Sequence, residues 1–222
     1  MMRDIADQKG FRAPLGEYPT LYAQLRVQDW TVPELQPDST APDTVSLEDL
    51  LEAEAVSIHE SPHAVVSTEG DTPLLIAKDV RLGRAPSRWG SAGAPGTVLV
   101  RKGDVAVVGG SAPAARVCVD DGVLLGPNIQ VVRVNSKALD PHFLAGVLRA
   151  AVEAADGQPI DLYRVAVPRR TLAEQRRYGL AFEQLNELES AWERRRTSVA
   201  ELVRLGFGGL AQGRLRPAAA PE

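Results

Sequence analysis

The chain has 222 residues, of which 44% are hydrophobic and 24% are charged, a composition that suits one globular domain with appended segments. No run of about 18 apolar residues is present, which excludes a transmembrane helix, and residues 1–10 carry charges without an apolar core, so neither a secretory signal nor a membrane partner is expected. The single cysteine, Cys118, excludes an internal disulfide framework and favours a reduced, cytoplasmic location.

The net charge of −4 is distributed unevenly along the chain. Residues 1–70 hold 4 basic and 13 acidic side chains, whereas residues 71–222 hold 21 basic and 16 acidic ones. Two stretches are locally basic: residues 78–104 carry six basic and two acidic side chains, and residues 164–177 carry five and one. Such blocks are compatible with binding a polyanion and equally with a solvated surface of mixed charge.

Residues 1–42 form the first predicted segment, an acidic arm that we expect to be poorly structured. Five prolines interrupt it, and residues 36–42 read as a linker. Its apolar side chains could still dock the arm against the domain or a partner, and they are Tyr18, Leu21, Tyr22, Leu25 and Trp30.

Residues 43–170 form the predicted domain. Ser46 and Asp49 have the spacing of a capping box and predict a short helix to about residue 55, and Pro141 predicts the start of a helix that ends near residue 155. Runs of β-branched and aliphatic residues predict strands at 64–67, 73–77, 97–100, 105–108, 115–119, 129–134 and 165–168. Closely spaced strands followed by helices predict an α+β domain built on a curved, mixed or mainly antiparallel sheet.

A long helix of the coiled-coil type is predicted at residues 171–212, opened by a capping box of Thr171 and Glu174. Apolar residues then repeat every seven positions, and such a stripe requires a partner helix from this chain or another. The residues expected to pair are Tyr178, Leu185, Leu188, Trp192, Val199 and Leu202, with Arg195 in the same seam. At roughly 1.5 Å per residue the helix would extend about 50–60 Å, which suits a spacer. Glycines from Gly206 onward should stop it, and residues 213–222 should form a disordered tail.

No catalytic constellation is recognisable. His59 and His63 have the spacing of a metal pair, but Ser61 and Pro62 between them disfavour a helix that would place both on one face. The sequence has neither a phosphate-cradling G-x-x-x-x-G-K-[ST] motif nor the Asn/Asp-Pro-Pro-Tyr/Phe motif of an amino-methyltransferase. We therefore expect no enzyme activity, no metal and no cofactor in this chain, with an enzyme of an unrecognised type as one open alternative.

Five short motifs resemble, in this order, the target-recognition domain of the specificity (S) subunit of type I restriction–modification systems. They are SLEDL at residues 46–50, LIAKDV at 75–80, VRKGDV at 100–105, LDPHFL at 139–144, and VP at 167–168 followed by LAEQRR at 172–177. Family subunits commonly carry two recognition domains and two spacer helices, so this chain resembles half of one. The join into the helix reads VPRRT, where the family pattern is VPLPP.

The resemblance implies sequence-specific recognition of double-stranded DNA without catalysis. It also implies a partner DNA adenine methyltransferase that carries S-adenosylmethionine, and a homodimer or a second S-type chain joined through the long helix. Base edges are read by side chains such as Arg and Asn, and phosphates are bound by Lys, Arg and Ser. The candidate DNA-binding residues are Lys78, Arg81, Arg84, Ser87, Arg88, Ser111, Arg116 and Asn128.

Plainer interpretations exist for these residues. The arginines could simply solvate a surface loop, and Asn128 could be a turn residue. Trp89 is expected to plug the core at a strand edge rather than to act as a base-facing wedge, and residues 102–104 are expected to form a structural turn. The alternative function is a protein–protein adaptor, in which the acidic arm and the heptad helix act while the sheet domain is a scaffold.

Overall fold

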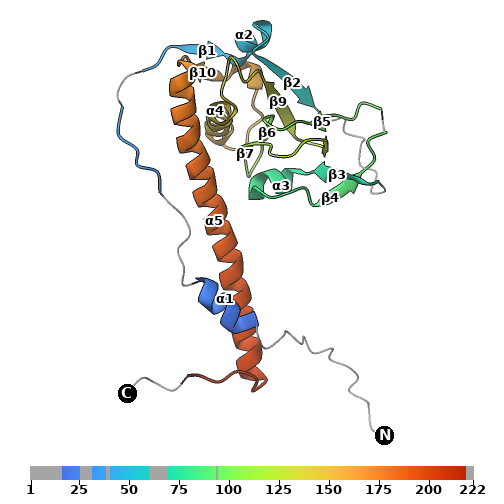
Figure 1. Ribbon diagram of the computed structural model, residues 1–222, viewed down its shortest axis with the longest axis vertical. Coiled ribbons are helices and arrows are strands. Elements are labelled where there is room, and N and C mark those ends of the chain that lie inside the picture. The colour runs from blue at the N-terminus through green and yellow to red at the C-terminus, as the bar shows by residue number, and fades with distance from the viewer. Residues whose placement is uncertain (1–16, 26–31, 39–40, 61–69, 94, 219–222) are drawn as a thin grey trace. The chain divides into compact units, whose positions relative to one another are not determined.

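The computed structural model describes residues 17–25, 32–38, 41–60, 70–93 and 95–218 (Figure 1). The chain divides into two units. The main unit comprises Thr31–Ser190, and the terminal unit comprises Met1–Trp30 together with Ala191–Glu222. No helix in the described stretches is both long enough and apolar enough to span a membrane.

The main unit contains three small sheets. An antiparallel sheet has the order β2-β9-β6-β7, formed by β2 (Val56–Glu60), β9 (Gln130–Val134), β6 (Val105–Val108) and β7 (Ala114–Val117). A mixed sheet has the order β4-β3-β8-β5, formed by β4 (Arg88–Gly90), β3 (Thr72–Leu75), β8 (Val123–Leu125) and β5 (Leu99–Val100). The third sheet pairs β1 (Thr44–Ser46) with β10 (Ala166–Pro168).

These sheets confirm the predicted α+β class, with strands spread over several sheets rather than one curved sheet. The other elements of the main unit are α2 (Leu47–Glu52), α3 (Ala77–Leu82), α4 (Pro141–Ala154) and the 3-10 turn η1 (Leu162–Arg164). The strand predicted at residues 64–67 lies outside the described residues.

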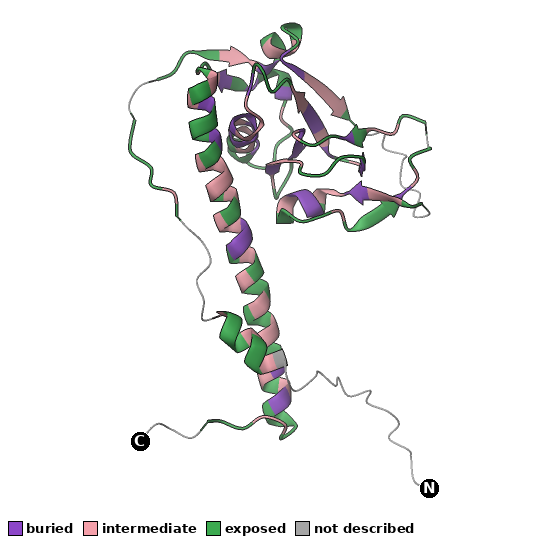
Figure 2. Ribbon diagram, in the orientation of Figure 1, coloured by how far each residue is buried: buried purple, intermediate pink, exposed green. Residues whose placement is uncertain are grey.

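Strand β6 is buried on both faces and lies between two hydrophobic cores (Figure 2). Its alternate residues Val105 and Val107 pack with Phe143 and Leu148 of α4, whereas Ala106 and Val108 pack with residues of the mixed sheet such as Leu125. Successive side chains of a strand point to opposite faces, so a strand covered on both sides is apolar throughout. The mixed sheet is thereby fixed against the antiparallel one.

The turn predicted at residues 102–104 is confirmed as a structural element. Gly103 has a φ of 89°, and the neighbouring Asp104 is 2% exposed. The Asp104 carboxylate accepts the Arg101 amide at 2.9 Å and both Nε and Nη2 of Arg133, at 3.0 and 2.9 Å. The turn is therefore held by a partner on β9, which the sequence motif did not reveal.

Helix α5 (Leu172–Ala211) confirms the predicted long helix and its cap. The Thr171 amide donates to Glu174 Oε2 at 2.8 Å, and the Glu174 amide donates to Thr171 Oγ1 at 3.3 Å. The expectation that the glycines from Gly206 would stop the helix was wrong, because only Gly213 adopts the left-handed region, with a φ of 66°. There the Gly213 amide donates to the Leu210 carbonyl at 3.0 Å and the Arg214 amide to the Gly209 carbonyl at 2.8 Å, which is a Schellman motif.

In the terminal unit, α1 (Glu17–Leu25) packs against α5 (Figure 1). Arg195 Nη2 donates to the Leu25 carbonyl at 2.6 Å, where a cation suits the helix C-terminus, and Tyr18 lies beside Gly206. The expectation that residues 1–42 are poorly structured was therefore wrong for residues 17–25. Pro19 lies in the first turn of the helix, where its missing N–H costs nothing.

Candidate nucleic-acid interface

Two segments that carry candidate residues meet at the carboxyl ends of the two central strands of the mixed sheet. Strands β3 and β8 are parallel neighbours, so α3, which follows β3, and residues 126–128, which follow β8, both start at the carboxyl ends of these strands. The Gly126 amide donates to the Leu75 carbonyl at 2.9 Å, and a Cβ on Gly126 would lie only 2.3 Å from that oxygen. Asn128 is exposed and has a φ of 61°, which fits its interpretation as a turn residue and leaves its amide at the surface.

Asp79 organises the segment from α3 to β4. Its carboxylate is fully buried and accepts four hydrogen bonds: from the Ile76 amide at 3.3 Å, the Ser87 amide at 3.0 Å, Ser87 Oγ at 2.7 Å and Arg84 Nε at 2.7 Å. The left-handed Gly83, with a φ of 57°, ends α3 and lets the chain fold back. Residues 84–87 are thus held against the start of the helix that precedes them.

The charge of Asp79 is stabilised by these contacts. Burial alone raises the pKa of the carboxyl, but the hydrogen bonds from Ser87, Arg84 and Ile76 outweigh burial and hold the pKa below its ordinary value. Asp79 therefore remains an anion that neutralises part of the Arg84 charge. Sequence reasoning noted Asp79 as a motif position but did not identify it as the anchor of the loop.

Several predicted DNA-binding residues are presented on this anchored segment. Lys78, Ser87 and Arg88 are exposed, and the Arg84 side chain is 43% exposed although Asp79 holds its Nε. Trp89 is 57% exposed, so its predicted role as a core plug was wrong. Strand β4 ends the mixed sheet, so Trp89 has a neighbouring strand on one side only in the described sheet.

Arg81 binds a second loop, between β6 and β7, and this loop carries Ser111. Arg81 Nε donates to the Ala112 carbonyl at 2.6 Å, and its Nη2 donates to the Gly109 carbonyl at 3.4 Å. The Arg81 guanidinium therefore supports the loop between β6 and β7, which carries the exposed Ser111. This loop therefore lies beside α3, as a DNA-binding surface formed by both would require. However, two of the three guanidinium nitrogens of Arg81 are used to hold the loop.

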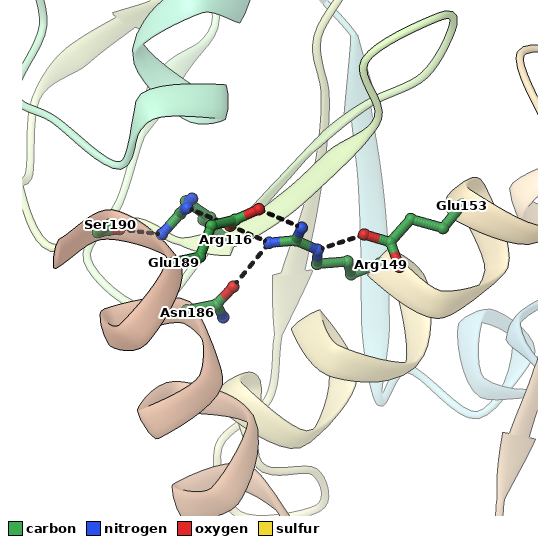
Figure 3. A network of polar contacts seen from close by, with 6 residues as sticks. All are labelled: Arg116, Arg149, Glu153, Asn186, Glu189 and Ser190. Atoms are coloured by element: carbon green, nitrogen blue, oxygen red, sulfur yellow. Dashed lines mark hydrogen bonds and ion pairs between the residues drawn. The ribbon is translucent and has the colours of Figure 1, made fainter. Parts of the chain in front are cut away.

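Arg116 belongs to a different assembly, which we call the helix clamp and which comprises Arg116, Arg149, Glu153, Asn186, Glu189 and Ser190 (Figure 3). Glu189 is its centre, since it accepts Arg116 Nη2 at 2.9 Å and two nitrogens of Arg149 at 2.6 and 2.8 Å. The clamp ties α5 to β7 and α4 within the main unit. The Arg116 side chain is 14% exposed, so we assign it to the clamp rather than to the surface.

The clamp lowers the pKa values of Glu189 and Arg116, whereas the hydrogen bonds to Glu189 raise the pKa of Arg149. Hydrogen bonds from Arg149 lower the pKa of Glu189 and outweigh the effect of burial. Burial lowers the pKa of Arg116, against the attraction of Glu189. The sequence contained no signal for this cluster, because Arg149 and Glu189 are 40 positions apart and neither lies in a motif.

The predicted helix-pairing residues are largely exposed. Within the main unit, Tyr178 and Leu185 are 40% and 39% exposed and Leu188 is half-buried; within the terminal unit, Trp192 and Val199 are 53% and 44% exposed and Leu202 is half-buried. The α5 residues that contact other elements of the main unit include Gln175, Gly179, Phe182, Asn186 and Glu189. Tyr178 of the predicted stripe is also among them, since its ring lies edge-on to Phe143 of α4 with 6.3 Å between the centroids. Leu185, Trp192 and Val199 therefore lie at the surface of their units, whereas Leu188 and Leu202 are half-buried and Tyr178 packs partly on Phe143.

Comparison with solved structures identifies the fold. The HsdS subunit from Thermoanaerobacter tengcongensis matches 86% of this chain and 50% of its own, with a TM-score of 0.50 and 20% sequence identity. A chain from a structure on complex assembly and conformational transition of the type I R-M system matches 90% of this chain and 52% of its own, with a TM-score of 0.50 and 23% identity. No family model and no curated protein matches the sequence. The chain spans about half the length of these two solved chains, and its fold is that of a type I specificity subunit over that half, as the five motifs predicted.

Proposed function

We propose that this chain is a sequence-specific DNA-recognition module of a type I-like restriction–modification system. The observation that carries the proposal is the anchored cationic segment from Lys78 to Arg88, on a fold shared with HsdS over most of the chain. Rigid presentation matters because base readout requires side chains held at fixed positions, and a loop tied by three hydrogen bonds to a buried carboxylate meets this requirement.

The roles of the side chains follow from their geometry. Arg88 and Lys78 are exposed cations suited to phosphates, which position a protein without reading sequence. Arg84 has its Nε fixed by Asp79 and its Nη2 by Ser87, so its Nη1 has a defined direction for a guanine or a phosphate. Asn128 and Ser111, on the two adjacent loops, can donate and accept hydrogen bonds at a groove.

The chain supplies no catalysis in this proposal. Residues 43–170 recognise one half of the target, and residues 171–212 form the spacer helix. Residues 1–42 are an accessory arm, of which α1 packs on α5, and residues 213–222 are a tail. Methyl transfer to adenine is carried out by a partner methyltransferase with S-adenosylmethionine bound to it, which the module positions.

A second recognition module joins through α5. The residues proposed to pair are those of the predicted stripe, namely Tyr178, Leu185, Leu188, Trp192, Val199 and Leu202. If two identical chains pair about a twofold axis, the DNA target is an inverted repeat with a constant gap, because the spacing of the half-sites follows the geometry of the dimer.

Selection of duplexes from a randomised pool by the full chain tests the proposal. We expect enriched sequences with a fixed gap, and an affinity that falls with salt at a slope of about −0.9 per phosphate contact. Arg84→Ala combined with Arg88→Ala should weaken binding at least 10-fold, at about 1.4 kcal/mol per factor of ten. The matched control is Arg196→Ala, a 69% exposed arginine of the terminal unit. A pool without enrichment, or equal losses in both variants, would contradict the proposal.

The adaptor remains a second candidate because of one observation. In the terminal unit, Val203, Phe207 and Leu210 are 50%, 75% and 51% exposed, and such large apolar side chains on a helix favour a protein partner. An adaptor without a DNA role would show no salt-dependent binding to any duplex.

A further inference from the structure

Trp89 is a large apolar side chain that the fold leaves in water. It is 57% exposed, although the rest of the mixed sheet contributes to a close-packed core through Leu75, Val123 and Leu125. A tryptophan that is not used in packing loses the stabilisation that burial of its ring would provide. Its exposure therefore calls for another role.

The backbone on both sides of Trp89 is fixed. Two residues before it, Ser87 is held by the buried Asp79 through its amide and its hydroxyl, at 3.0 and 2.7 Å. One residue after it, Gly90 is buried, pairs with Thr72 and is so close to Gly70 that a Cβ there would lie 2.0 Å from the Gly90 oxygen. The ring is thus presented by rigid chain rather than by a loose loop.

The surroundings of the ring select for an anionic partner. Arg84, Ser87 and Arg88 precede it and are exposed, and Lys78 is exposed on the adjoining helix. The one acidic residue between positions 77 and 90, Asp79, is buried and hydrogen-bonded to Arg84. An exposed ring on a segment whose exposed charges are all cations matches a nucleic acid, which offers both bases and phosphates.

We propose that Trp89 inserts against a base step of duplex DNA, while the exposed cations of the segment from Lys78 to Arg88 bind phosphates. This inference rests on the proposed function and extends it, because the contact gives a form of recognition that base-edge hydrogen bonds do not. Wedges of this kind partly unstack a step, and the cost is lowest at the flexible pyrimidine–purine steps. Trp89 thereby makes the module prefer a deformable step at one position of its half-site.

The first experiment uses the full chain and a duplex that it has selected from a randomised pool. Trp30→Phe with Trp192→Phe leaves Trp89 as the one tryptophan of the chain, which contains three. Saturation with the duplex should quench its emission, because the ring moves from water into contact with bases. Unchanged emission at saturation would overturn the proposal.

The second experiment compares affinities for the same duplex. Trp89→Ala should weaken binding about 10-fold with an unchanged salt slope, whereas Trp89→Phe should retain most of the affinity. Arg88→Ala should instead reduce the salt slope by about 1. Leu99→Ala is the matched control, since Leu99 is 46% exposed on β5 at the other edge of the same sheet, and it should bind as the unchanged chain does.

The outcomes separate the two proposals. If Trp89→Ala binds the selected duplex within twofold of the unchanged chain, the Trp89 contact is wrong and the DNA-recognition function stands. A stronger preference for single-stranded oligo-dT than for the duplex would also overturn the duplex wedge. If the unchanged chain binds no duplex, both proposals fall. Because Trp89 is exposed, its replacement should leave the unfolding midpoint unchanged, which checks that the variants are folded.

Discussion

Two carboxylates in the main unit, Asp79 and Glu189, bind arginines in opposite arrangements. Asp79 is fully buried and binds Arg84, whose side chain remains 43% exposed. Glu189 is itself 41% exposed and binds Arg116 and Arg149, whose side chains are only 14% and 22% exposed. In the first cluster the acid is hidden and a cation faces water; in the second the cations are covered and the acid is at the rim.

The difference shows why a count of basic residues does not locate an anion-binding surface. Arginines whose nitrogens are consumed by carboxylates inside the fold contribute to stability, as those of the helix clamp do. An exposed arginine such as Arg84, held at Nε by Asp79 and at Nη2 by Ser87, keeps its Nη1 for a ligand. Replacements of Asp79, of Glu189 and of two arginines, taken from the largest expected effect to the smallest, test this division.

Replacement of Asp79 should have the largest effect and should affect both stability and DNA binding. Asp79→Ala leaves the Ser87 and Ile76 donors without their acceptor and Arg84 without its counter-charge, so we expect a loss of about 3 kcal/mol in the free energy of unfolding. Urea titration, in which unfolding is monitored by amide hydrogen exchange in β6, measures this loss in the main unit.

The pH dependence of the free energy of unfolding tests whether Asp79 is ionised in the folded protein. Because the folded pKa of Asp79 lies below its ordinary value of 3.8, its contribution is present above that value and is lost as the pH falls through the folded pKa. In Asp79→Asn this part of the acid sensitivity should vanish. An acid profile identical to that of the unchanged chain would show that the anchor is not ionised.

Replacement of Glu189 should have a smaller effect, confined to stability. Glu189→Gln removes the charge that pairs with Arg116 and Arg149, and because the carboxylate is 41% exposed we expect about 2 kcal/mol rather than the full cost of breaking a buried pair. The same urea titration measures it, with Glu187→Gln, an exposed glutamate on the same helix, as the control. A loss no larger than that of the control would mean that the clamp does not hold α5.

Exchange of arginine for lysine should have the smallest effect and should separate the two clusters most clearly. Arg149→Lys loses the fork that binds Glu189, Asn186 and Glu153 together, and should cost about 1 kcal/mol of unfolding free energy. Arg88→Lys should change it by less than about 0.5 kcal/mol, because the side chain is exposed. Equal losses of unfolding free energy in Arg149→Lys and Arg88→Lys would contradict the distinction between the two clusters.

Features fixed by neighbouring residues were predictable from the sequence. The capping boxes at Ser46 and Thr171, the start of α4 at Pro141 and the turn at Gly103 all depend on contacts within a few positions, and all are present. The order of five local motifs was likewise enough to predict the fold that the solved HsdS structure shares.

Features that depend on distant partners were not predictable. Trp89 was expected inside because tryptophan is apolar, but β4 ends its sheet and the core stops before the ring. The heptad pattern predicted Trp192 and Val199 in a seam, whereas the buried residues of this part of α5 include Ala191 and Leu205, one position away from that row. Helix α1 packs here, and its backbone approaches closely enough for Arg195 to bind the carbonyl of Leu25.

The sequence by itself determined where α2, α4 and α5 begin and that a basic segment follows β3, because each of these depends on short-range hydrogen bonding and on the spacing of apolar residues. Only the tertiary structure decided which cations face water. Residues 40 or more positions apart, such as Arg149 and Glu189 or Arg116 and Ser190, meet through packing of whole elements, and a guanidinium cannot serve both an internal carboxylate and an external phosphate with the same nitrogens.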